Sequence, residues 1–143
     1  MLVATGVNEK LGVNMSWEIK TLAVLLDKDE NLAVSQEGDC LFLTSEHGID
    51  AYVSLGGEQI IVESLLFAMS QVSNTAALNE AVLRSHKLFP LTTVGIVSVD
   101  GTEYYAAFGA LSVNSSEDDI RLEIDFLFQN IEDMLDTYEE FIN

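Results

Sequence analysis

Cysteine and basic residues are scarce in this 143-residue chain, and each scarcity excludes a class of protein. Cys40 is the single cysteine, so no intramolecular disulfide and no cysteine-based zinc cage can form, and a reducing, cytoplasmic compartment is expected. Six Lys and Arg stand against 24 Asp and Glu, which gives a net charge of -18. Nucleic acid and anionic lipid are bound through clustered cations, so neither is an expected partner. No apolar run approaches the ~20 residues of a membrane span, so no such span is expected.

Apolar residues, in contrast, are abundant. They make up 48% of the chain, which is enough to build the core of one domain of this length. The periodic pattern begins at Met15-Ser16-Trp17. We therefore expect a single domain over residues 15–143, preceded by a flexible leader over residues 1–14.

Three segments are predicted to be helices from their apolar spacing. The first covers residues 16–28 with Ser16 as its N-cap, and the second covers residues 75–88 between an Asn74 cap and Pro90. The third runs for about 26 residues after a Ser116 cap. Its apolar positions recur at spacings of three and four: Ile120, Ile124, Leu127, Ile131, Met134, Tyr138 and Phe141.

Short extended segments separated by turn residues are predicted to be strands. The first four segments, 32–36, 40–44, 49–55 and 58–69, are linked by short turns typical of an antiparallel meander. Asp100-Gly101 joins segments 93–99 and 102–111 as a type I′ hairpin. The predicted fold class is α+β, in the order α-β(3–4)-α-β(2)-α, with helices packed on an antiparallel sheet.

Residues with reactive side chains are isolated in the sequence. His47 and His86 lack flanking residues at metal-ligand spacing, and Cys40 lacks neighbouring cations that would stabilise a thiolate. Glycine-rich phosphate loops, nucleophile elbows and complete calcium loops are also absent from the sequence. We expect no catalytic residue, no cofactor and no metal. An enzyme would require Cys40, His47 or His86 to gather with acidic residues in a pocket.

Acidic residues concentrate on the last predicted helix. Ten acids and one base lie between Glu117 and the C-terminus, opposite the apolar stripe. A surface of this kind suits a basic protein partner. The expected contact residues are Glu132, Asp133, Asp136, Glu139 and Glu140, with Tyr104 and Tyr105 as further candidates on the sheet. For the two tyrosines the alternative is ordinary strand packing. For the apolar stripe, widened by Phe126, Phe128 and Leu135, the alternative to core packing is a partner or homodimer seam.

Several motifs resemble a known bacterial family. They are Lys-Leu-Phe-Pro-Leu at 87–91, Phe-Gly-Ala-Leu-Ser at 108–112, the Ser115-Ser116 cap and Leu122-Glu123-Ile124, with Met15-Ser16-Trp17 and Glu139-Glu140-Phe141 at the two ends. Together they resemble the YjfI-like family, which carries domain of unknown function 2170. The order of elements is similar to that of type III secretion chaperones and YbjN-like regulators. The resemblance implies a protein-binding role, an envelope-stress setting and a phage-shock-protein-A-like partner.

These observations favour a non-enzymatic, acidic protein-binding adaptor or chaperone-like module. The first alternative is a small acidic structural or regulatory domain whose charge reflects its medium. An enzyme of unknown type is the second alternative.

Overall fold

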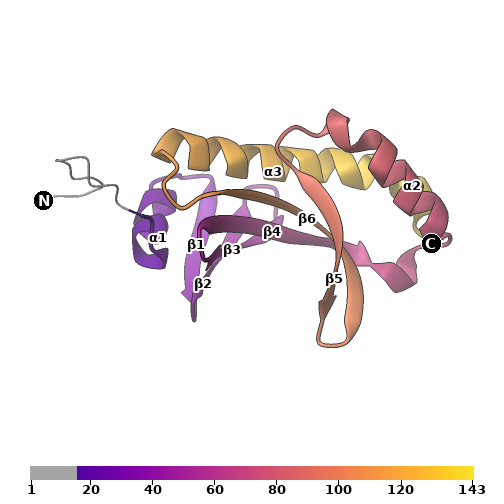
Figure 1. Ribbon diagram of the computed structural model, residues 1–143, viewed down its shortest axis with the longest axis horizontal. Helices are drawn as coiled ribbons and strands as arrows, with labels where there is room; N and C mark the ends of the chain where they lie inside the picture. Colours follow the sequence, from indigo (N-terminus) through magenta and orange to yellow (C-terminus); the bar gives the residue numbers. More distant parts are fainter. Residues whose placement is uncertain (1–15) are drawn as a thin grey trace, which may run out of the picture.

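The computed structural model describes residues 16–143, which form a six-stranded sheet with three α-helices (Figure 1). The elements are α1 (Ile19–Asp27), β1 (Leu32–Glu37), β2 (Cys40–Ser45), β3 (Asp50–Gly56), β4 (Gln59–Ala68), α2 (Thr75–Ser85), β5 (Thr93–Val99), β6 (Thr102–Ser112) and α3 (Glu117–Thr137). Short 3-10 turns follow β4 (η1, Met69–Gln71), α2 (η2, His86–Leu88) and α3 (η3, Glu139–Phe141). This order confirms the predicted α+β fold. The leader expected over residues 1–14 lies outside the described residues.

All neighbouring strands are antiparallel, in the order β1-β2-β3-β4-β6-β5. The first four strands form the predicted meander. The α2 segment then carries the chain past β4, so that β6 can pair between β4 and β5. Asp100 and Gly101 have φ values of 50° and 82°, as a type I′ turn requires, and Val99 pairs with Thr102 across the turn.

The helices lie on one face of the sheet, and α3 runs along its length (Figure 1). Alternate residues of the strands, such as Leu41, Val53 and Val62, are buried beneath the helices. The predicted apolar stripe of α3 faces the same core, since every member from Ile120 to Tyr138 is almost fully buried. Phe128 is also buried, so its side chain is not available as part of a partner seam.

Two of the three predicted helix caps are confirmed. The Asn74 side chain accepts a hydrogen bond from the Ala77 N–H at 3.1 Å, and Ser116 Oγ accepts one from the Asp119 N–H at 3.1 Å. The Ser16 cap is wrong, because α1 begins at Ile19 with Glu18 at the N-cap position. Ser16 instead donates a hydrogen bond to the side chain of Asn114 at 3.2 Å.

Helix α3 is shorter than the apolar spacing predicts, because it ends at Thr137 after 21 residues. Tyr138 and the 3-10 turn Glu139–Phe141 follow, and this turn continues to direct apolar side chains toward the core. The chain then runs beside residues 71–73, where the Ser73 N–H donates to the Phe141 carbonyl at 2.9 Å. No helix among residues 16–143 combines the length and hydrophobicity needed to cross a membrane.

Candidate functional site

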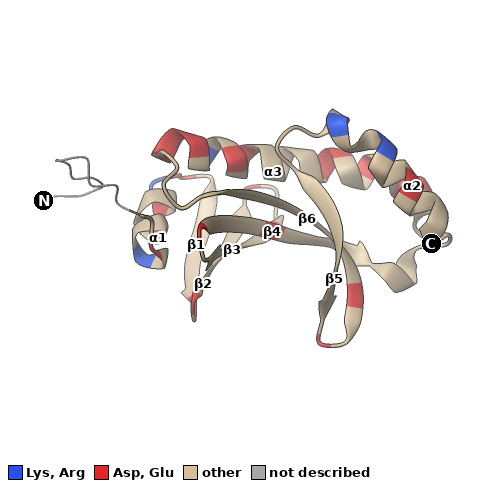
Figure 2. Cartoon of the chain, viewed as in Figure 1, with Lys and Arg blue, Asp and Glu red and all other residues tan. Residues whose placement is uncertain are grey.

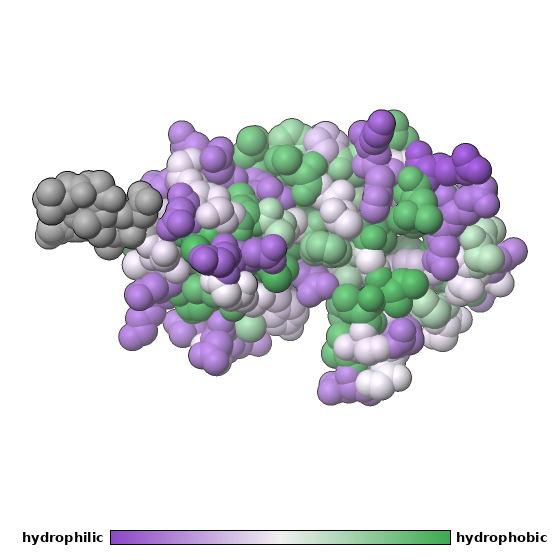
Figure 3. All heavy atoms as spheres, viewed as in Figure 1, coloured by the Kyte–Doolittle hydropathy of each residue, from purple (hydrophilic) through white to green (hydrophobic). Residues whose placement is uncertain are grey.

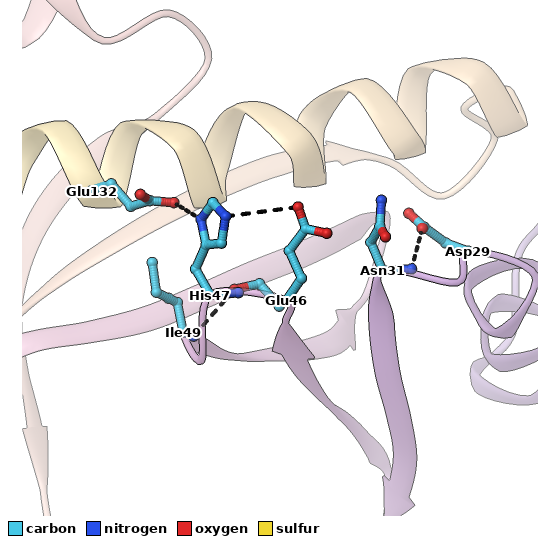
Figure 4. Close-up of polar contacts among 7 residues, drawn as sticks. Asp29, Asn31, Glu46, His47, Ile49 and Glu132 are labelled. Carbon is cyan, nitrogen blue, oxygen red and sulfur yellow. Dashed lines mark hydrogen bonds and ion pairs between the residues drawn. The ribbon is translucent and has the colours of Figure 1, made fainter.

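A cleft of about 360 Å³ lies beside the middle of α3, and we refer to it as the α3 cleft. Three segments that are far apart in sequence line it: the turn after α1, the β2–β3 turn and one side of α3. Figure 4 shows the polar contacts along it. The lining residues are Asp29, Asn31, Leu32, Ser45, Glu46, His47, Asp125, Phe128, Gln129, Glu132 and Asp133.

Local hydrogen bonds fix the two turns that border the α3 cleft. Ser45 Oγ accepts hydrogen bonds from the N–H groups of His47 at 3.3 Å and Ile49 at 3.1 Å. Asp29 Oδ1 accepts one from the Asn31 N–H at 2.9 Å, which closes an Asx-turn after α1. These bonds hold His47 against α3 and place Asp29 at the opposite wall (Figure 4).

His47 and Glu132 form the direct polar link across the α3 cleft. Nδ1 of His47 lies 2.7 Å from a Glu132 carboxylate oxygen, and Glu46 lies 3.7 Å from Nε2. The hydrogen bond that Glu132 accepts from His47, the charge of Glu132 and the weaker effect of Glu46 raise the pKa of His47 above its usual 6.5, and desolvation opposes this shift. The carboxylates thus favour the imidazolium form in a largely solvent-exposed pair.

The remaining charges of the α3 cleft are negative. Burial raises the pKa of Asp125, and the nearby Asp29 raises it further, whereas Arg121 opposes the shift. Five carboxylates line the cleft, and no Lys or Arg does. Such an arrangement is suited to hold a cationic group of a ligand, because carboxylates accept charge-assisted hydrogen bonds from ammonium and guanidinium groups.

The five acidic residues predicted as contacts are all exposed. They are Glu132, Asp133, Asp136, Glu139 and Glu140, and we call this set the acidic stripe. Figure 2 shows acidic residues at several positions along α3. Glu132 and Asp133 line the α3 cleft, whereas Asp136 and the two η3 glutamates extend the stripe toward the C-terminus. The structure therefore joins the predicted stripe to a cleft at one end.

The two candidate tyrosines point to opposite faces of the sheet. Tyr105 is 2% exposed, packs on Phe67 and donates a hydrogen bond from its hydroxyl to Asn79 at 2.6 Å. It has no surface to offer a partner, and ordinary packing accounts for it. Tyr104 is half-buried on the face without helices.

Of the three residues that an enzyme would require, His47 lies with acidic residues in the α3 cleft, whereas Cys40 and His86 are not part of its lining. Cys40 begins β2, and His47 follows the other end of the same strand. His86 lies in η2, where its Nε2 accepts a hydrogen bond from the Val94 N–H at 3.1 Å. Within residues 16–143, no group of three or more His, Cys, Asp or Glu is arranged to hold a metal ion.

The sequence pattern does not show that His47, Asp29 and Asp125 contribute to the α3 cleft. His47 and Glu132 are 85 residues apart, and only the packing of α3 over the meander brings them together. The local signals were the Asp29-x-Asn31 turn and the Glu46-His47-Gly48 turn, which indicate two loops without showing that both border one helix.

The chain matches a family model and several known proteins. The model described as "Uncharacterized protein conserved in bacteria (DUF2170)" matches residues 16–142. The uncharacterized protein YjfI of Escherichia coli K12 is 35% identical over 131 residues, covering 89% of this chain and 98% of YjfI. YjfI of Escherichia coli O157:H7 matches equally well. Among solved structures, Escherichia coli YbjN superposes with a TM-score of 0.64 at 15% identity, covering 85% of this chain and 91% of YbjN, which shows a shared fold.

Proposed function

The chain belongs to the bacterial DUF2170 family of uncharacterized proteins, and we propose that it acts as a non-enzymatic adaptor that binds a basic segment of another protein. The α3 cleft carries this proposal. It presents five carboxylates without a competing Lys or Arg in its lining, and it opens onto the acidic stripe. A Lys or Arg side chain of a partner would enter the cleft while neighbouring basic residues contact the stripe.

The setting that we propose is the bacterial envelope-stress response, with a phage-shock-protein-A-like protein as the specific partner. This part follows from the family resemblance. If the proposed partner is correct, a purified protein of that class binds the chain and competes with a basic peptide for the α3 cleft.

The binding test compares two variants that lose the same number of charges. Glu132→Gln/Asp133→Asn/Asp136→Asn neutralises part of the acidic stripe, and Glu58→Gln/Glu80→Gln/Glu103→Gln neutralises three exposed acids on other elements. With a Lys/Arg-rich peptide at low salt, we expect the stripe variant to lose roughly tenfold or more in affinity, because several charge pairs of ~0.5–1 kcal/mol each are removed. The control variant should lose only the small effect of lower net charge.

Equal losses in the two variants would contradict the proposal. They would instead favour a small acidic structural or regulatory domain whose charge reflects its medium. Isothermal titration at two ionic strengths provides the measurement, since contacts between exposed charges weaken as salt screens them.

A further inference from the structure

One face of the sheet has no helix on it, and we refer to it as the open face (Figure 1). Its side chains alternate with the buried ones along each strand, and the strand register aligns them across the sheet. Phe42 lies opposite Tyr52, Leu65 opposite Ala106, and Val97 opposite Tyr104. The larger apolar side chains of the open face are Phe42, Tyr52, Ile61, Leu65, Val97, Val99, Tyr104 and Phe108.

The open face is apolar, although water reaches it. Tyr52 is 46% exposed and Leu65 is 43% exposed. The rings of Phe42 and Tyr52 pack at 5.0 Å between centroids, and Phe108 lies so close to Gly95 that a Cβ there would meet the ring at 3.3 Å. An antiparallel sheet with one solvated side usually carries polar residues on that side. The many apolar side chains of the open face, among which Glu63 lies between Tyr52 and Phe108, therefore indicate a binding partner.

The charges around the open face are all acidic. Glu37, Asp50 and Glu63 lie on the face itself, and Asp39 and Asp100 lie at the ends of the two outer hairpins. Every Lys and Arg among residues 16–143 lies on a helix or in the turn after one: Lys20, Lys28, Arg84, Lys87 and Arg121. An occupant with an apolar centre and basic edges would therefore complement this surface.

The shape of the surface also selects the occupant. Figure 3 shows a notch in the side of the molecule away from α3, between the main body and the β5–β6 hairpin, with apolar residues on the hairpin wall. A hollow of this kind fits a rod such as a helix, which is about 10 Å across. A second copy of the chain would bring another hollow surface, another set of acids and a further charge of -18.

We propose that the open face binds the apolar side of an amphipathic helix whose flanks carry Lys and Arg, supplied by a protein partner. This inference rests on the proposed function, since it describes the basic protein that the adaptor would bind. The five intervals between six strands, each about 4.8 Å, span about 24 Å, which a helix of about 18 residues, about 27 Å long at 1.5 Å per residue, would cross. The apolar residues of the helix would pack on Tyr52, Leu65 and Phe108, and its basic residues would pair with Glu63, which lies between Tyr52 and Phe108, and with Glu37 and Asp50.

The test uses two synthetic peptides of about 18 residues and identical composition. One places leucines along a single side of the helix with lysines on both flanks, and the other distributes the leucines around the helix. The full chain is compared with Tyr52→Ser/Leu65→Ser and with a control, Leu83→Ser/Leu88→Ser, which removes two exposed leucines outside the open face. If the first variant does not fold, Val99→Ser at the edge of the face replaces it.

We expect the chain to bind the amphipathic peptide about tenfold more tightly than the scrambled one, because buried apolar anchors dominate such interfaces. The open-face variant should lose this preference, and the Leu83/Leu88 control should keep it. Equal binding of both peptides by the unmodified chain, or a preference that survives in the open-face variant, would overturn the inference. A homodimer in sedimentation that Tyr52→Ser/Leu65→Ser dissociates would also overturn it, because a second copy would then occupy the face.

The two proposals fail in different ways. If the inference alone is wrong, both peptides still bind with a salt dependence that the acidic-stripe variant removes. If neither peptide binds at low salt, the proposed function itself is wrong.

Discussion

At the scale of single residues, Glu123 is a buried acidic residue on the core-facing side of α3. It is 6% exposed and packs against Gly109 of β6 so closely that a Cβ at that glycine would overlap its carboxylate. Desolvation raises the pKa of Glu123 above its usual 4.5. The protonated carboxyl is therefore favoured by the fold. The stabilisation that the protonated Glu123 carboxyl gives the folded state is fully present below pH 4.5, and it is lost as pH rises through the raised pKa.

We predict that Glu123→Gln raises the melting temperature at neutral pH, because ionisation of the buried native side chain is unfavourable there. The gain should shrink near about pH 4, where the native carboxyl is protonated in both states. Thermal melts at the two pH values measure this, with Glu139→Gln as an exposed control. A gain of equal size at both pH values would contradict the assignment.

Asn130 connects α3 to the loop before β5. Its side-chain N–H groups donate to the Pro90 carbonyl and to Thr92 Oγ1, both at 2.8 Å, and the residue is 3% exposed. We predict that Asn130→Ala lowers the free energy of unfolding by about 1–3 kcal/mol, because the buried Thr92 hydroxyl and the Pro90 carbonyl lose their donor. Urea denaturation measures the effect, and the exposed neighbour Gln129→Ala should change it by less than about 0.5 kcal/mol.

Pairings of this kind could not be predicted from the sequence. Asn130 and Pro90 are 40 positions apart, and an Asn within an amphipathic pattern looks like a solvent-facing residue. The same limit applied to His47 and Glu132, whereas the Ser116 and Asn74 caps act within three residues and were predictable.

At the scale of elements, the start of α3 depends on its cap. Ser116 Oγ binds the Asp119 N–H, and Glu117, Asp118 and Asp119 place negative charge at the positive end of the helix dipole. We predict that Ser116→Ala costs about 1 kcal/mol of stability by urea denaturation. Ser115→Ala is the matched control, because Ser115 contributes its backbone groups to hydrogen bonds. Equal costs for both substitutions would show that the cap is not the cause.

Element boundaries show where local patterns stop being sufficient. The α3 pattern continues to Phe141 because the 3-10 turn after Tyr138 returns apolar residues to the same core. The α1 boundary shifts from Ser16 to Glu18 because residues 16 and 17 bond to the chain near α3, as in the 2.7 Å hydrogen bond from the Trp17 indole to the Ser115 carbonyl. Both differences come from contacts between distant segments, and the spacing of apolar residues along the sequence does not predict such contacts.

At the scale of the whole molecule, the acid excess is divided among surfaces with different neighbours. The open face carries a few acids among exposed apolar side chains. The acidic stripe is joined to a cleft that contains His47. The raised pKa of His47 favours its imidazolium form, which pairs with Glu132, below pH 6.5, and this ion pair is lost as pH rises through the raised pKa. Protonated His47 thus competes with any cation that enters the cleft.

We predict that a Lys/Arg peptide binds more tightly at about pH 9 than at about pH 6, because lysine keeps its charge over this range while His47 loses its own. Titration calorimetry at several pH values measures the trend. His47→Gln should bind with nearly the same affinity across the range, and His86→Gln, whose ring contacts Val94 instead, should follow the native profile. If the affinity of His47→Gln changed with pH as that of the native chain does, another group would be the cause of the pH dependence.

The central claim is that a basic partner binds at the α3 cleft and the acidic stripe. Its most direct test is a nitrogen-15 NMR titration of the full chain with a Lys/Arg-rich peptide at low salt. We expect the backbone shifts of His47, Glu132 and Asp133 to change most, to saturate together and to revert at high salt. Shifts spread evenly over the acidic residues of all elements, or confined to residues far from α3, would contradict it.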